Sequence, residues 1–168
     1  MSLTFVVGSA ADVFPGDLAR AIDAELRARH PALAPDSHGP YESEPVDAAG
    51  WRKLQERVLR MLDYAPQITS VDAYQAVYLP GVAAGVEHVA VATLADPLQI
   101  GSLPSLLEEL HRFALAAMLP TDDVELMKLA VYYLETDFDA DLDIQTYVQL
   151  MLSARQAGAR TQALWVVV

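Results

Sequence analysis

Residues 68–79 read ITSVDAYQAVYL, and this stretch decides the class of the fold. Upstream of it, apolar residues recur at helical spacing. Within it they fall at every second position, with Val71, Ala73, Val77 and Leu79 alternating with polar or aromatic neighbours. Alternation with a period of two is typical of a β-strand. The chain therefore changes from helix to sheet here, and a fold that mixes the two is expected.

A second apolar stretch, VEHVAVATL, follows at residues 86–94. The turn-forming pair Pro80-Gly81 and then Gly85 separate the two stretches. Two strand-like runs joined by a short loop predict an antiparallel hairpin. The second run is apolar on both faces, so it is expected at the centre of the sheet.

Farther outward, five segments carry apolar residues at helical spacing: 18–26, 51–62, 103–118, 122–134 and 144–154. Ser105 with Glu108 is a candidate capping box, with Ser102 as the competing cap. The helix after Asp122 carries Leu126, Met127, Ala130 and Leu134 as its apolar residues.

Short apolar runs at 3–7 and 163–168 predict a strand at each end of the element order. That order is β-α-α-β-β-α-α-α-β. It predicts an α+β fold with a small mixed or antiparallel sheet of about four strands, and with helices mainly on one face.

The composition predicts a single domain over residues 1–168. Hydrophobic residues make up 53 % of the 168 and charged residues 20 %, which favours a packed core. There is no cysteine, no apolar run long enough to cross a membrane and no basic segment before Leu3. We therefore expect a cytoplasmic protein without a secretory signal. The preference for arginine over lysine is typical of bacterial genomes rich in GC.

The formal net charge of −12 limits the class of partner. Such a field repels phosphate backbones, so nucleic-acid binding is not expected. It favours a basic protein or a cation. Because the apolar fraction is high for this length, a homodimer is also expected as one arrangement.

Carboxylates occupy alternate positions in one segment: Glu135, Asp137, Asp139, Asp141 and Asp143. Oxygen-rich loops suit hard divalent cations, the only cofactor that the sequence suggests. The EF-hand template fails, because Leu142 or Ile144 stands where its turn glycine is needed. The alternative is a solvated loop whose last acids favour the start of the next helix.

The proline-rich segment 31–47 is the longest stretch without predicted structure, and loops of that length are often functional. It carries polar candidates for partner binding: His38, Tyr41, Glu42 and Glu44. Tyr74 and Tyr78 share one face of the strand at 71–79. They would form a contact surface if that face were exposed, or would cover the helix layer if it were not.

No nucleophile elbow, phosphate loop or zinc-protease motif is present. Two hypotheses follow. The first is a non-enzymatic, acidic interaction domain, comparable in charge and size to bacterial immunity or adaptor proteins. The second is a metal-binding domain or metal-dependent enzyme that uses residues 135–143, with His38 or His88.

Overall fold

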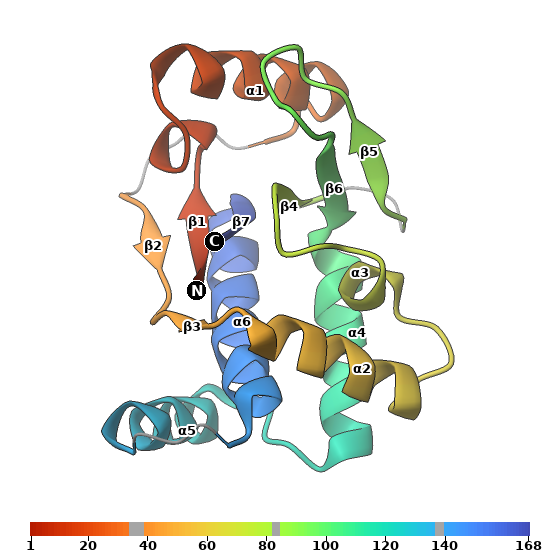
Figure 1. The fold of residues 1–168 in the computed structure, drawn as a ribbon, viewed down its shortest axis with the longest axis vertical. Coiled ribbons are helices and arrows are strands. Elements are labelled where there is room, and N and C mark those ends of the chain that lie inside the picture. Colours follow the sequence, from red (N-terminus) through yellow and green to blue (C-terminus); the bar gives the residue numbers. More distant parts are fainter. Residues whose placement is uncertain (34–38, 82–84, 137–139) are drawn as a thin grey trace.

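The computed structural model describes residues 1–33, 39–81, 85–136 and 140–168. Among these residues it has seven strands, six α-helices and one 3-10 turn (Figure 1). The strands are β1 (Ser2–Gly8), β2 (Tyr41–Glu42), β3 (Val46–Asp47), β4 (Ala76–Leu79), β5 (Glu87–Val89), β6 (Leu98–Ser102) and β7 (Ala163–Val167). The helices are α1 (Gly16–Arg29), α2 (Ala49–Met61), α3 (Pro66–Thr69), α4 (Leu103–Ala117), α5 (Asp123–Glu135) and α6 (Leu142–Arg160). The 3-10 turn is η1 (Ala10–Asp12).

The strands form one mixed sheet in the order β2-β1-β7-β4-β6-β5, with β3 also paired to β1. Every pairing is antiparallel except that of β4 with β6. The expected α+β class is therefore confirmed, but the expected count of about four strands was too low. The shortest strands, β2 and β3, lie inside the proline-rich segment, where no strand was predicted.

The two faces of the sheet are covered unequally. Along β4, Ala76 and Tyr78 face the main core, which α2 to α6 complete. Val77 and Leu79 face a second, smaller core, whose only long helix among the described residues is α1. Helices mainly on one face were predicted, and α1 is the exception. α1 and α5 lie at opposite ends of the long axis of the molecule (Figure 1).

The predicted hairpin does not form. β4 pairs with β7 on one side and with β6, in parallel, on the other, while β5 pairs only with β6. β5 is thus an edge strand and not a central one. The strand that separates them, at residues 98–102, was missed because Pro97 and Gly101 were interpreted as chain breaks.

All five predicted helices are present, and α3 is additional. α4 is capped by Ser102, whose hydroxyl accepts a hydrogen bond from the Ser105 amide at 3.3 Å, so the competing cap was the correct one. Asp122 caps α5 through the Glu125 amide at 3.0 Å. Within the described ranges, no helix has both the length and the apolar character that a membrane span needs.

A buried polar network joins α3 to the sheet. The Gln67 side chain accepts a hydrogen bond from the Ser102 amide at 2.8 Å and donates one to the Gly85 carbonyl at 2.9 Å. The Tyr78 hydroxyl donates to the Gln67 carbonyl at 2.6 Å. Gly101 lets the chains approach closely here, because a Cβ would lie 2.5 Å from Cδ1 of Tyr78 and 2.6 Å from Oε1 of Gln67.

Glu109 of α4 completes this network. Its two carboxylate oxygens accept hydrogen bonds from the amides of Gln67 at 3.1 Å and Ile68 at 3.0 Å, at the start of α3. Burial raises the pKa of the Glu109 carboxyl to about 7, although the two amides and Arg112 favour its charged form. The negative charge of Glu109 also raises the pKa of Tyr78, whose burial is the larger cause.

Gly101→Ala is expected to lower the free energy of unfolding by about 2 kcal/mol, because Tyr78 and Gln67 must move to admit a methyl group. Denaturant unfolding measures this loss. Gly39→Ala is the control, because a Cβ there meets nothing within 4 Å. Equal stability of the two variants would contradict the close approach at Gly101.

The raised pKa of Glu109 predicts a pH dependence of stability. The folded state holds this proton more tightly than the unfolded chain. The free energy of unfolding is therefore expected to fall by up to about 3 kcal/mol as pH rises from about 4.5 to about 7. Glu109→Gln should flatten the profile in this window, and Glu108→Gln, an exposed neighbour on α4, should not. Superimposable profiles for wild type and Glu109→Gln would refute the assignment.

Candidate functional site

The outward face of α5 is apolar. Val124, Met127, Val131 and Leu134 are 65 %, 52 %, 46 % and 59 % exposed, while Leu126 and Ala130 are buried. Met127 and Leu134 were predicted with the buried pair, and the structure places them on the solvent side. α6 is the main neighbour of α5, so this helix packs on one side only.

These four exposed residues, which we call the α5 stripe, follow the spacing i, i+3, i+7, i+10. Residues at this spacing lie along one side of a helix. At 1.5 Å per residue the stripe is about 15 Å long. Val124, Met127 and Val131 line a shallow, wide-open hollow of about 570 Å³. An apolar surface that is open in this way suits a protein surface better than a small molecule.

Carboxylates surround the α5 stripe: Asp122, Asp123 and Glu125 at its start and Glu135 at its end. The nearby cations are already paired. Lys128 donates to Glu125 at 2.6 Å, and Arg155 of α6 donates to Asp123 at 2.5 Å. The excess charge around the stripe is therefore negative.

The predicted metal-binding segment begins where α5 ends. Glu135 is exposed, Asp141 precedes α6 with a left-handed φ of 59°, and Asp143 lies in the first turn of α6. Asp137 and Asp139 lie outside the described residues. Asp143 accepts a hydrogen bond from Arg57 at 2.7 Å, with both side chains mostly buried.

No group of three or more histidine or acidic side chains placed to share a cation occurs among the described residues. The metal site therefore stays a prediction. His88 lies on β5, on the other side of the molecule from the end of α5 (Figure 1), and so does not join that segment.

The candidates in the proline-rich segment do not form one surface. Tyr41 is half-buried on β2 and packs against the main core, while Glu42 and Glu44 are exposed. Ser43 between them is buried and exchanges two hydrogen bonds with Phe5 of β1. His38 lies outside the described residues.

The two tyrosines that were predicted on one face of a strand differ in their exposure to solvent. Tyr78 is fully buried, so of the two alternatives, covering the helix layer is the correct one for this residue. Tyr74 precedes β4 and is 57 % exposed. It lines an open cleft of about 770 Å³ between α2 and the start of β6.

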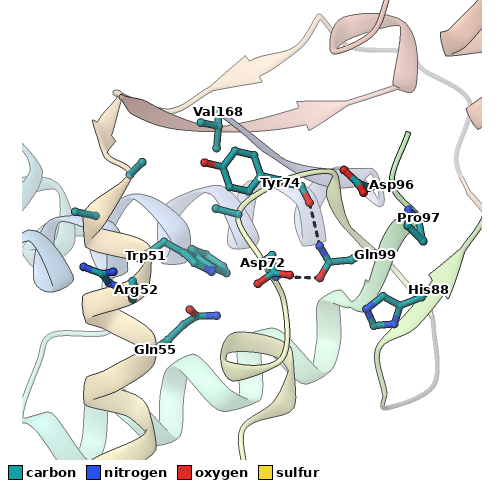
Figure 2. Close-up of a pocket in the computed structure, with 13 residues that line it drawn as sticks. Trp51, Arg52, Gln55, Asp72, Tyr74, His88, Asp96, Pro97, Gln99 and Val168 are labelled. Atoms are coloured by element: carbon teal, nitrogen blue, oxygen red, sulfur yellow. Dashed lines mark hydrogen bonds between the residues drawn. The ribbon is translucent and has the colours of Figure 1, made fainter. Parts of the chain in front are cut away.

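This cleft is organised around Gln99 of β6, which is buried (Figure 2). The Gln99 side chain accepts a hydrogen bond from the Asp72 amide at 2.9 Å and donates one to the Tyr74 carbonyl at 3.0 Å. His88 is the antiparallel partner of Gln99 across the β5–β6 pair, so both side chains lie on one face of the sheet. Asp96 and Trp51 also line the cleft.

Sequence reasoning missed both the cleft and the exposure of the α5 stripe. The cleft gathers residues from α2, the 72–75 loop, β5 and β6, and their proximity depends on strand pairings that were predicted wrongly. The stripe did leave a signal, because α5 is apolar on nearly all sides: Val124, Leu126, Met127, Leu129, Ala130, Val131 and Leu134. A helix that is apolar on nearly all sides is either buried on all sides or exposes an apolar face that no other element covers.

Comparison of the chain with protein-family models, with curated proteins and with solved structures gives no match in any of the three.

Asp143→Asn is expected to lower the free energy of unfolding by about 1–2 kcal/mol, because it leaves the mostly buried Arg57 without its charged partner. Chemical denaturation measures the loss, and the Arg57→Met/Asp143→Asn double variant should recover part of it. Asp141→Asn is the control, because Asp141 has no ion pair among the described residues. An unchanged stability for Asp143→Asn would show that the carboxylate is free for another role.

Proposed function

We propose that this protein is a non-enzymatic, acidic interaction domain that holds an amphipathic, basic helix of a partner protein against α5. The observation that supports this most directly is the α5 stripe: four apolar side chains, each about half exposed or more, along one side of a well-capped helix. Recognition of an amphipathic helix uses apolar anchors at the same i, i+3 and i+7 spacing.

The negative charge around the α5 stripe determines which kind of partner helix can bind there. Because Lys128 and Arg155 are already paired, the carboxylates of Asp122 and Glu135 remain to attract lysine or arginine beside the partner's apolar anchors. The net charge of −12 acts in the same direction over a longer range and speeds association with a basic partner. It also opposes the pairing of two identical copies across this face, so a second copy is the less favoured occupant.

The size of the stripe sets the expected strength. A single helix face of this length gives a contact at the small end of specific interfaces, and such contacts are typically weak and transient. A dissociation constant in the micromolar range is therefore expected, with a strong dependence on salt, because part of the attraction is between exposed charges.

The test uses a synthetic amphipathic peptide of about 18 residues, with leucines at i, i+3, i+7 and i+10 and lysines flanking them. Binding is measured by fluorescence anisotropy at low and high salt. We expect saturable binding to the wild type that weakens at high salt, and at least tenfold weaker binding to Val131→Asp, which places a charge in the centre of the stripe. A peptide with glutamates in place of the lysines should not bind.

Leu59→Asp is the control, because Leu59 of α2 is also an exposed apolar residue, 64 % exposed against 46 % for Val131, but lies outside the stripe. Equal loss of binding in Leu59→Asp and Val131→Asp would reject α5 as the docking face.

Sedimentation of the free protein supplies the other decisive result. A wild-type dimer that Val131→Asp dissociates would mean that a second copy occupies the stripe, and the proposal would be wrong.

A further inference from the structure

We propose that the cleft around Gln99 is a separate binding site for a small organic amine that carries an apolar or aromatic body. This inference is independent of the α5 stripe. α5 contributes no residue to the cleft, which lies between α2 and the β5–β6 edge of the sheet (Figure 2).

The free hydrogen-bonding groups on the wall of the cleft determine which polar groups a ligand can carry. Three of the side-chain donors on this wall already have protein acceptors, and His88 and Arg52 are the other nitrogen-bearing side chains there. The Trp51 indole donates to the Val71 carbonyl at 2.9 Å, the Gln55 amide donates to the carbonyls of Ile68 and Val71, and the Gln99 amide donates to Tyr74. These bonds use the Trp51 indole N–H and both amide protons of Gln55, so a ligand that needs a donor from Trp51 or Gln55 would find none available.

By contrast, two acceptor side chains of the cleft have no protein donor among the described residues. In the part of the chain that the structure describes, the carboxylates of Asp72 and Asp96 have no hydrogen-bond or ion-pair partner. Next to Tyr74, Gln75 has a left-handed φ of 53°, and its buried Oε1 accepts no hydrogen bond there either. Gln75 and Asp96 also line a smaller hollow that adjoins the cleft at Tyr74. Gln75 does not line the cleft and its Oε1 is buried, so the free acceptors that the cleft offers are the two exposed carboxylates, whose negative charge complements an ammonium group.

The other lining residues define the body of the ligand. The Tyr74 ring is exposed beside the two carboxylates and offers a face to a cation or to another ring. Trp51, Ala73 and Pro97 add apolar surface. Arg52, the only lysine or arginine among the described residues of the wall, stands on the far side of Trp51 (Figure 2). Its Nε lies 3.9 Å from Oε1 of Glu56. A volume of about 770 Å³ is in the range of small-molecule sites.

Tryptamine is the probe, and indole-3-propionate, which has the same ring and the opposite charge, is its matched control. Isothermal titration calorimetry with the wild type should show saturable binding of tryptamine at millimolar concentration or below, and none of indole-3-propionate. The Asp72→Asn/Asp96→Asn double variant should weaken tryptamine binding at least tenfold. Tyr74→Leu should weaken it severalfold without changing the net charge.

The Asp17→Asn/Asp63→Asn double variant removes the same charge from exposed positions outside the cleft and should bind like the wild type. Thermal melting verifies that each variant is folded. Three results would overturn the proposal: no tryptamine binding, equal binding of the two indoles, or an equal loss in the two double variants. None of them bears on docking at α5, and Val131→Asp should leave tryptamine binding intact.

Discussion

The buried side chain of Gln67 is the contact on which the rest of this structure depends. Its amide joins the end of β6 to the loop at Gly85, while its main chain binds Glu109 of α4 and Tyr78 of β4. Unpaired polar groups in a core are costly, so α3, α4, β4 and β6 are stable together only in the arrangement that satisfies all of them. That arrangement sets the β4–β6 pair, and with it the position of Gln99 in the cleft.

Local patterns were sufficient for the helices and insufficient for the sheet. Apolar spacing located five helices because the side chains of a helix turn are neighbours in sequence. Strand partners need not be neighbours, and the expected pairing of 68–79 with 86–94 failed because β6 lies between β4 and β5. Gly101 was misleading for a physical reason. It was interpreted as the end of an element, but it is a point where Tyr78 and Gln67 come too close for a side chain.

For the candidate sites, too, local sequence features predict one part and fail for the other. The acidity could be predicted from composition, and the basic partner is a proposal that rests on it, whereas the location of a contact face could not be predicted. Met127 and Leu134 have the character of core residues, and only the packing of α5 on α6 shows that they face outward. Asp72, His88 and Asp96 belong to three different segments, and the fold brings all three to the wall of the cleft around Gln99. No spacing in the chain encodes that.

The central place of β7 has a consequence for how the protein is made. β7 lies between β1 and β4, yet it is the last strand in sequence order. While the ribosome is still elongating the chain, β1 and β4 have emerged but lack their shared neighbour, so each exposes an unpaired strand edge. The sheet can therefore close only after β7 has been synthesised, and until then the free edges of β1 and β4 can pair with other chains.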